Sequence, residues 1–336
     1  MHTKLNYFLL TIVLLSLSAC AQSSDYFNRH VFCAALVTDT LGLNDHGLAE
    51  DAWKGLEQSM SDSVVDEISY IESVDTRDYE KNISYFAKQG FDVIITSGVG
   101  LQDETLRSAD LYPDSVFIGI NQPQEESRPN LIPVTFAEDQ MGFVAGTIAA
   151  TITETNIVGA ACETSGIDSM WRYCEGFRAG ALFINPDIKV IVIYREDGDR
   201  EKLFIDEAWG AATAQKLIQH GVDVLFAAGG VTGQGALRAA SDAGLYVIGA
   251  ERDQAAALAP ESGKGVVTSI YGSASFEVQT LMRLLKDGNE YGPRIGQFGY
   301  VPLGLEFPES SSDELNLLIK AVFNGDIMTN VTSERP

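Results

Sequence analysis

The sequence predicts an α/β fold built from two similar lobes, each a parallel β-sheet with helices on both faces. Short, continuous apolar runs alternate with longer segments of helical periodicity from Val31 onward, and this alternation is typical of parallel sheets. The same order of strands, glycines and polar residues then recurs about 130 residues further along the chain. A length of 336 residues corresponds to about two domains of ~150 residues each.

The first lobe is expected to begin at Val31, and its elements follow in a regular order. A helix over residues 78–89 is predicted because Tyr79, Ile83 and Phe86 recur at helical spacing, and Gly90 is a typical helix stop. The predicted elements, in order, are a strand at Val31–Thr38, a helix over 49–60, a strand at Asp66–Ile71, the helix over 78–89, and strands at Phe91–Thr96 and Val116–Ile120.

The second lobe repeats this pattern. Residues 89–95 recur as residues 220–226, displaced by 131, and 117–120 recur as 247–250, displaced by 130. The strand end at 37–42 has its counterpart at 161–166, and 66–71 has its counterpart at Lys189–Tyr194. All parallel α/β folds share some of this pattern, but three similar displacements favour a duplicated architecture.

Composition excludes several classes of protein. With 45% hydrophobic and 21% charged residues the chain is an ordinary globular protein, so disorder is excluded as its main state. The 47 acidic residues outnumber the 23 basic ones, which gives a formal charge of −24. This balance disfavours nucleic acid as a partner, and it disfavours docking on an anionic membrane through charge alone.

Residues 1–19 have the features of an export signal. Lys4 precedes an apolar run of about ten residues, which is too short for a membrane span of ~20. Leu17-Ser18-Ala19-Cys20 resembles a bacterial lipoprotein box, which implies cleavage before Cys20 and attachment of fatty acyl lipid such as palmitate. Residues 20–30 are then a tether, and the protein is anchored at the extracytoplasmic face of the cell membrane; the alternative is an ordinary secreted protein.

Three cysteines remain besides Cys20. Export to an oxidising compartment permits a disulfide, and Cys162 and Cys174, twelve residues apart, are the candidate pair; the sequence leaves open whether they are bonded. Cys33 lies inside an apolar strand and is interpreted most simply as a buried thiol.

Polar residues and glycines follow the predicted strands in both lobes. Because ligands bind outside the carboxyl ends of parallel strands, we expect two facing rims and a cleft between the lobes. The alternative for each single acid is a helix cap. The rim residues are Asp39, the Ser97–Gly100 loop and Asn121 in the first lobe, and Glu163, the Gly229–Gly233 loop with Thr232, Glu251 and Asp253 in the second.

The sequence lacks the common catalytic motifs. There is no Gly-x-Ser-x-Gly elbow and no Gly-x4-Gly-Lys-[Ser/Thr] phosphate loop. The histidines after the signal (His30, His46 and His220) are far apart, and no Cys-x-x-Cys spacing occurs. We therefore expect no enzyme activity, no metal and no cofactor.

Eight segments stand in order along the chain: 36–45, 52–56, 138–146, 175–181, 185–187, 227–235, 247–254 and 268–270. Together they resemble the basic membrane protein family, whose members are lipoproteins that bind purine nucleosides for ABC importers. The resemblance implies a type I periplasmic-binding-protein fold, with two Rossmann-like lobes joined by a three-crossing hinge. It places lobe 1 at 31–135 and 256–298, and lobe 2 at 136–255 and 299–330.

The resemblance also implies a set of ligand-binding residues: Asp39, Asn44, Asp45, Gly98, Asn121, Gly229, Glu251 and Asp253. Several positions depart from the family pattern. Gly47-Leu48 replaces Ser-Phe, whose Phe stacks on the base, and Tyr271 replaces Lys. Trp171, beside the Glu163 loop, is either a replacement stacking platform or a core residue.

The function implied is that of a monomeric substrate-binding lipoprotein of an ABC importer. Its two lobes would close on a purine nucleoside or a related ribosyl compound, and a membrane permease would recognise the closed form. Three alternatives remain: a sensor of the same fold that signals to a membrane receptor, a lipid-anchored nucleoside hydrolase, and a surface adhesin or antigen.

Overall fold

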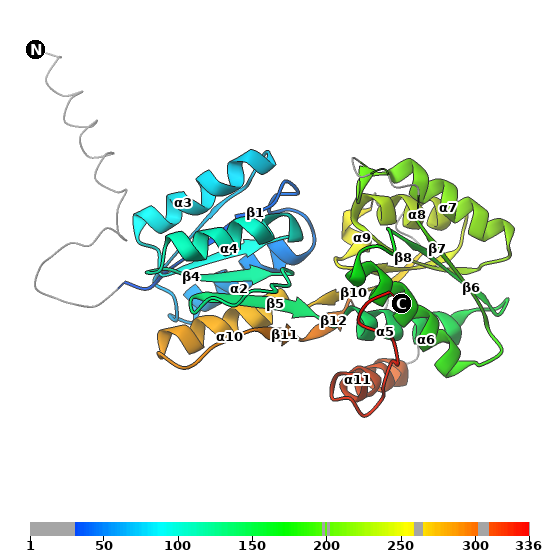
Figure 1. The fold of residues 1–336 in the computed structure, drawn as a ribbon. Helices are drawn as coiled ribbons and strands as arrows, with labels where there is room; N and C mark the ends of the chain where they lie inside the picture. Colours follow the sequence, from blue (N-terminus) through cyan, green and yellow to red (C-terminus); the bar gives the residue numbers. More distant parts are fainter. Residues whose placement is uncertain (1–30, 197–198, 200–201, 259–264, 302–308, 336) are drawn as a thin grey trace, which may run out of the picture. The chain divides into compact units, whose positions relative to one another are not determined.

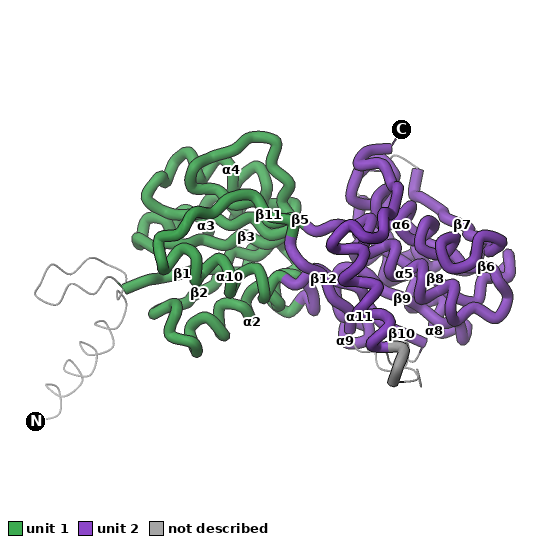
Figure 2. The backbone as a smooth tube through the Cα atoms, turned by 90° about the horizontal axis from the view of Figure 1, so that it is seen from below, with its two compact units in different colours: residues 1–44, 48–135, 274–295 green, residues 45–47, 136–273, 296–336 purple. Residues whose placement is uncertain are grey.

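The computed structural model describes residues 31–196, 199, 202–258, 265–301 and 309–335. The predicted signal, Cys20 and the tether lie outside the described residues. The chain divides into two compact units (Figure 2). Among the described residues, unit 1 comprises the chain up to Asn44, Leu48–Thr135 and Ala274–Ile295, and unit 2 comprises Asp45–Gly47, Phe136–Ser273 and the chain from Gly296 onward.

Unit 1 contains a sheet with the strand order β11-β5-β4-β3-β1-β2. Helices α3 and α4 supply side chains to the core on one face of this sheet, while α2 contacts β1, β2 and β3 and packs against α10 (Figure 1). The elements are β1 (Cys33–Thr38), α2 (Leu48–Ser61), β2 (Glu67–Ile71), η1 (Thr76–Asp78), α3 (Tyr79–Gln89), β3 (Val93–Ser97), η2 (Val99–Leu101), α4 (Gln102–Leu111), β4 (Val116–Ile120), β5 (Leu131–Phe136), α10 (Ala274–Lys286) and β11 (Arg294–Gly296).

Unit 2 contains a sheet with the strand order β12-β10-β9-β8-β6-β7. Helices α7 and α8 supply side chains to the core on one face of this sheet. Helices α5 and α6 pack tightly against each other; α5 contacts β8, β9 and β10, and α6 contacts β6, β7 and β8. The elements are α5 (Glu138–Ile152), β6 (Ile157–Cys162), α6 (Asp168–Ile184), β7 (Lys189–Tyr194), α7 (Glu207–Gln219), β8 (Val224–Ala228), α8 (Gly230–Asp242), β9 (Tyr246–Ala250), α9 (Gln254–Ala257), β10 (Val266–Gly272), β12 (Phe298–Tyr300) and α11 (Glu309–Phe323).

The two sheets have the same topology. The strand orders of the two units match position by position, with β1, β3, β4 and β5 of unit 1 corresponding to β6, β8, β9 and β10 of unit 2. In unit 1 these four strands run parallel as β1–β3, β3–β4 and β4–β5 pairs, and in unit 2 the same three pairings recur. The duplicated α/β architecture predicted from the displaced segments is therefore confirmed.

The strands are buried because helices cover both faces of each sheet. Every residue of β1, β3 and β8 is buried, and these strands are apolar except for Thr38, Thr96 and Ser97 near their carboxyl ends. Helix α3 ends as the sequence predicts, at Gly90, which adopts φ 80° and donates its backbone amide to Ala87 O. A left-handed residue at this position satisfies the last carbonyls of a helix.

Two of the three crossings differ from the expected lobes, at Ala274 and at Gly296. The chain returns to unit 1 at Ala274, whereas the resemblance places this crossing at 256. Strand β10 remains in unit 2 because it pairs in parallel with β9 and antiparallel with β12. The other two crossings fall at Thr135–Phe136 and Ile295–Gly296.

Cys162 and Cys174 form a disulfide that joins the end of β6 to helix α6. Cys33 is buried in β1, but it is disulfide-bonded, so the interpretation as a buried thiol is wrong. No helix in the described ranges combines the length and the apolar character that crossing a membrane requires.

Candidate functional site

In unit 1, three predicted site residues lie at neighbouring strand ends. Asp39 follows β1, Gly98 follows β3 and Asn121 follows β4, and these strands are adjacent in the sheet. The Asp39 carboxylate lies against Gly98, where an added Cβ would stand only 2.3 Å from Oδ2. Gly98 also adopts φ 110°, which other residues rarely reach, so the close approach of the two strand ends requires glycine.

The side chain of Gln122, which is not among the predicted site residues, forms hydrogen bonds to the Gly98 loop and to β3. Its side chain is fully buried, its Nε2 donates to Gly98 O at 2.9 Å, and its Oε1 accepts from Thr96 Oγ1 at 3.2 Å. Gly119 leaves the space, because a Cβ there would lie 2.5 Å from Gln122 Oε1. A buried, hydrogen-bonded amide of this kind fixes the Gly98 loop.

Unit 2 repeats the arrangement at its own strand ends. Glu163 follows β6, Gly229 follows β8 and Glu251 follows β9. Gly229 adopts φ 118°, and an added Cβ would stand 2.6 Å from Glu163 Cβ. The pair Glu163–Gly229 therefore corresponds to Asp39–Gly98 of unit 1, as the repeat in the sequence predicts.

Asn121 and Glu251 share an unusual backbone conformation. Both are left-handed, with φ of 57° and 69°, and both stand directly after corresponding strands. Their backbone amides donate to equivalent carbonyls of the next strand, Val134 O at 2.8 Å and Ile270 O at 3.0 Å. Left-handed backbone costs roughly 1–2 kcal/mol in a residue such as glutamate, whereas asparagine adopts it more readily, and strain of this kind is concentrated at functional sites.

The Glu251 carboxylate faces the start of helix α8. It accepts a hydrogen bond from the Gly230 backbone, and the positive charge of Arg252 also favours its ionised form. Burial nevertheless raises the pKa of Glu251 above its ordinary value, since the loss of hydration outweighs both partners. Burial also raises the pKa of Tyr173 on α6, and the neighbouring Glu251 charge raises it further.

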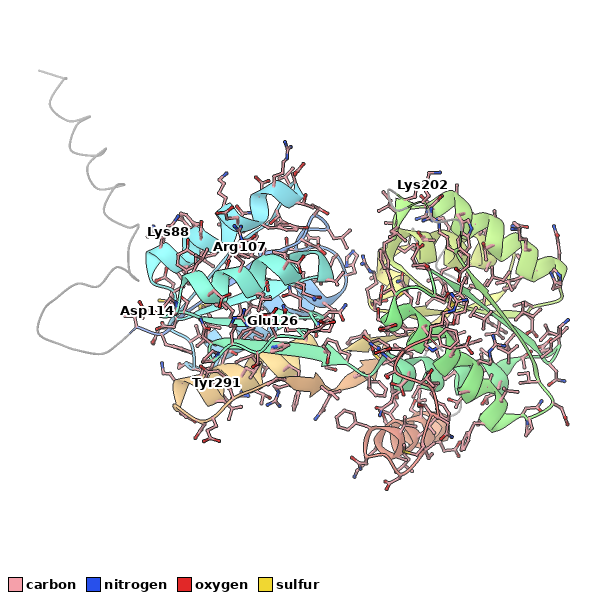
Figure 3. The ribbon with its side chains drawn as sticks, viewed as in Figure 1. Lys88, Arg107, Asp114, Glu126, Lys202 and Tyr291 are labelled. Carbon is pink, nitrogen blue, oxygen red and sulfur yellow. A yellow bond between two sulfur atoms is a disulfide. The ribbon has the colours of Figure 1, made fainter. Side chains whose placement is uncertain are left out.

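Glu163 has a different environment, because its negative charge is paired with groups of the protein itself. The side chain is fully buried; Oε1 lies 3.4 Å from Arg195 Nη1, and Oε2 accepts from the Phe204 amide at 3.0 Å. Arg195, also buried, lies 3.4 Å from Asp206 and donates to the carbonyl of Lys202, a residue labelled in Figure 3. A contact between Glu163 and a ligand stays a prediction.

Two further predicted residues of unit 2, Thr232 and Asp253, accept hydrogen bonds from nearby backbone amides. The Thr232 hydroxyl is buried and accepts from the Asp206 amide at 3.0 Å. The Asp253 carboxylate caps helix α9 by accepting from Ala256 N at 3.1 Å, as the capping alternative foresees. One carboxylate oxygen suffices for that cap, so capping and ligand binding by Asp253 are compatible.

The loop that follows β1 contributes residues to both units. Asn44 is exposed and groups with unit 1. Asp45–Gly47 group with unit 2, where Arg252 Nη1 donates to Asp45 O at 2.8 Å and Asp253 N donates to His46 O at 2.9 Å. Asp45 and Asp253, predicted from separate segments, are thus brought together.

Trp171 and Tyr271 lie in other surroundings. The Trp171 ring stacks on Tyr194, with centroids 5.9 Å apart and planes at 18°, and its Nε1 donates to Thr332 Oγ1 at 3.3 Å. Tyr271 borders a cavity of about 380 Å³; the remaining lining residues are Phe298, Gly299, Tyr300, Ser312, Asn316 and Ile319.

The strand ends offer hydrogen-bonding groups suited to holding a small polar molecule. Three residues with carboxylates and one asparagine stand directly after the strands: Asp39, Asn121, Glu163 and Glu251. Among the described residues, no three His, Cys, Asp or Glu side chains are placed to hold a metal ion.

A doubled parallel topology with polar strand ends is the architecture of solute-binding proteins of the type I periplasmic fold. An ABC transporter solute-binding protein from Conexibacter woesei has this fold, with a TM-score of 0.72, 20% sequence identity, and coverage of 88% of this chain and 98% of that one. The fold class predicted from the sequence is therefore confirmed.

The family follows from the sequence itself. A family model described as ABC transporter substrate-binding protein PnrA-like matches residues 32–295, so the chain belongs to the Bmp family. It is a substrate-binding protein of the ABC transporter type, a class that implies a small-molecule ligand and a permease partner and whose role is binding and not catalysis.

Two relatives extend the match. The nucleoside-binding protein BmpA of the ABC transporter in Lactococcus lactis is 29% identical over 293 residues, which cover 81% of each chain. Basic membrane protein A1 of Borrelia garinii is 25% identical over 309 residues, which cover 87% of this chain and 86% of that one. The resemblance to the basic membrane protein family is thus confirmed.

Proposed function

We propose that this protein captures a purine nucleoside, or a closely related ribosyl compound, for an ABC importer. The observation that supports it best is the matched pair Asn121 and Glu251, two polar residues held in left-handed backbone at equivalent strand ends. A strained polar residue repeated in both units favours a functional cause over a local accident of packing. The relative from Lactococcus lactis, named as nucleoside-binding, supports the ligand class.

The chemistry of the strand ends favours a neutral ligand rich in hydroxyl groups. Glu251 and Asp253 would accept hydrogen bonds from ribose hydroxyls, since bonds to a carboxylate are stronger than bonds between neutral groups. The same carboxylates would repel a phosphate. Asn121 can both donate and accept, so it could pair with a purine edge that carries one donor and one acceptor.

Binding would be coupled to closure of the two units. A ligand that contacts the polar strand ends of both units stabilises the closed state only if it binds that state better than the open one. Asp39 and Asn121 would contribute contacts from unit 1, and Glu251 with Asp253 from unit 2. The permease would then distinguish the closed form from the open one.

Membrane attachment would come from lipid on Cys20. The predicted signal and lipoprotein box support this proposal, and Cys20 lies outside the described residues. We expect the wild-type chain to fractionate with membranes and Cys20→Ser to be released from them. Recovery of wild-type protein only in the soluble fraction would contradict the anchor.

Isothermal titration of the ligand-free protein tests the ligand class. We expect guanosine, inosine or adenosine to bind, with free ribose at least tenfold weaker because it lacks the stacking and edge contacts of the base. Glu251→Gln should weaken nucleoside binding by roughly tenfold, the loss of about one charge-assisted hydrogen bond.

Glu154→Gln is the matched control, because Glu154 is an exposed glutamate of unit 2; it should bind as wild type does. No heat with any nucleoside would remove the nucleoside proposal. Release of free base during incubation would show hydrolysis and would contradict a role in binding alone.

A further inference from the structure

The chain from Thr329 to Arg335 lies along one side of unit 2, against α5 and α6 (Figure 1). This segment lies beyond residues 32–295, which the family model matches. Its contacts begin at the first turn of α5, where Thr329 Oγ1 donates to Asp139 Oδ2 at 2.5 Å.

The middle of the segment contacts the start of α6. Thr332 Oγ1 accepts from Trp171 Nε1 at 3.3 Å, and Ser333 O accepts from Arg172 Nη1 at 2.9 Å. Arg172 also pairs with the buried Glu138 of α5 at 2.9 Å. The segment is therefore tied to the same arginine that joins α5 to α6.

The end of the segment reaches the carboxyl ends of β6 and β7. Arg335 Nη1 donates to Ser165 Oγ and lies 3.3 Å from Glu196 Oε1. Ser165 also donates to Glu196, so the three side chains form one connected group. These positions adjoin the buried pair Glu163–Arg195, because Ser165 is two residues beyond Glu163 and Glu196 follows Arg195.

The loop that the segment holds has few supports of its own. Helix α6 begins after Ile167, which provides no side-chain cap for the helix. The disulfide fixes Cys174, which lies within α6, to the end of β6. The loop from Thr164 to Ile167 and the first turn of α6 lie between these two fixed points.

We propose that Thr329–Arg335 is a strap that positions the β6–α6 loop and the first turns of α6, and through them the β6–β7 part of the strand-end site in unit 2. Trp171 is the side chain positioned most directly, since the strap binds its indole N–H while Tyr194 stacks on its ring. The strap's effect on nucleoside affinity rests on the proposed function; its effect on the loop does not.

Each contact of the strap is weak, so their combined effect is the one to measure. Arg335 and Glu196 are 52% and 51% exposed, and exposed ion pairs contribute little on their own. Removal of Arg335 should therefore accelerate amide exchange in residues 164–172 by roughly fivefold, and removal of the whole strap should do so by more.

The experiment uses hydrogen exchange read by mass spectrometry on the chain without its signal. The variants are Arg335→Ala, Thr332→Val and a chain that ends at Ile327. Arg335→Lys tests rescue, because lysine can still pair with Glu196. Arg107→Ala is the matched control: this arginine of unit 1, labelled in Figure 3, is 50% exposed and pairs with Glu80 and Glu104.

We expect faster exchange confined to residues 164–172 in the three strap variants, wild-type exchange in α7 and α8, substantial rescue by Arg335→Lys, and no change at this loop in Arg107→Ala. Unchanged exchange at 164–172 in both point variants would overturn the proposal, whether or not the shortened chain folds. Faster exchange throughout unit 2 would also overturn it, because the segment would then support the whole unit.

Titration with inosine on the same samples separates this proposal from the function. If wild type binds inosine, the strap variants should bind it about fivefold more weakly. If wild type does not bind, the nucleoside proposal fails while the exchange result still decides the strap.

Discussion

The acidic residues at the strand ends of unit 2 differ in what surrounds their charge. The Glu163 carboxylate is buried, and it forms an ion pair with Arg195 and accepts a hydrogen bond from a backbone amide. Glu251 is opposed more weakly, by Arg252 and the Gly230 amide, and burial raises its pKa. A carboxylate that is costly to bury and poorly compensated is the one that gains most from a ligand hydroxyl.

The raised pKa of Glu251 leads to a prediction about stability. The protonated form is favoured in the folded state, so this group contributes stability below the ordinary pKa of about 4.5 and loses it as pH rises through the folded pKa. Glu251→Gln removes this loss of stability at higher pH, because glutamine does not ionise. We expect the variant to melt at the same temperature as wild type at pH 4 and about 2–4 °C higher at pH 7, the effect of ~1 kcal/mol.

Thermal melts followed by circular dichroism at both pH values test this prediction. Glu154→Gln, an exposed glutamate, should show no such difference between the two pH values. A lower melting temperature for Glu251→Gln at pH 7 would contradict it.

The buried pair Glu163–Arg195 predicts strong non-additivity. Arg195→Met leaves the fully buried Glu163 charge without its arginine, which should cost about 3–5 kcal/mol of unfolding free energy. Glu163→Gln combined with Arg195→Met should cost less than Arg195→Met alone, because no unpaired charge is left inside. Urea unfolding of the single and double variants measures this coupling; simple additivity would show that the two charges do not depend on each other.

At the scale of elements, the tight α5–α6 pair depends on glycines spaced four residues apart. A Cβ at Gly142 or Gly146 of α5 would lie 2.0 Å from Tyr173 O or Phe177 O of α6. A Cβ at Gly176 or Gly180 of α6 would lie 2.2 or 1.9 Å from carbonyls of α5. The two helix backbones are therefore in direct contact, which holds α6 and its tyrosine close to the strand ends.

Gly146→Ala should destabilise the protein, although alanine is the better helix former by ~1 kcal/mol. The added methyl group has no space against the Phe177 carbonyl, and overpacking of this kind costs typically 1–3 kcal/mol or more. We expect a net loss of about 1–2 kcal/mol in urea unfolding. Gly292→Ala, where nothing lies within 4 Å of the added Cβ, should be neutral; equal effects of the two changes would refute the packing argument.

At the scale of the whole molecule, the charge of −24 affects which ligands can approach. A neutral nucleoside is indifferent to this field, whereas a nucleotide is repelled, most strongly at low ionic strength. We expect inosine affinity to change less than twofold between 50 and 500 mM NaCl. Inosine monophosphate should bind at least tenfold more weakly than inosine at 50 mM salt, and titration at both salt concentrations tests this; tighter binding of the monophosphate would contradict the neutral-ligand proposal.

The regular parts of the fold could be predicted because they depend on local patterns. The strand at Val116–Ile120 was predicted with the observed bounds, and the helix that ends before Gly90 was predicted within one residue. Periodicity and a stop glycine are properties of neighbouring residues, so one sequence suffices to detect them. The repeat likewise predicts that Asp39 and Gly98 correspond to Glu163 and Gly229.

The residues that were missed have partners far away in the chain. Gln122 fixes the Gly98 loop from 24 positions away, and Arg195 pairs with Glu163 from 32 positions away. Arg195 is visible in the sequence, but nothing there identifies its partner. The strap is the extreme case, with Arg335 and Ser165 separated by 170 residues.

The sequence by itself determined the α/β class, the duplication and which polar residues stand at strand ends, because alternation, glycines and repeats are written along the chain. The tertiary structure decided how each of those polar residues is used: Glu163 neutralised by Arg195, Asp253 capping a helix, Trp171 held by the strap, and Asn121 and Glu251 left in strained backbone. The physical reason is that the cost of a buried charge or a twisted backbone depends on neighbours in space, and those neighbours come together only when the sheets form.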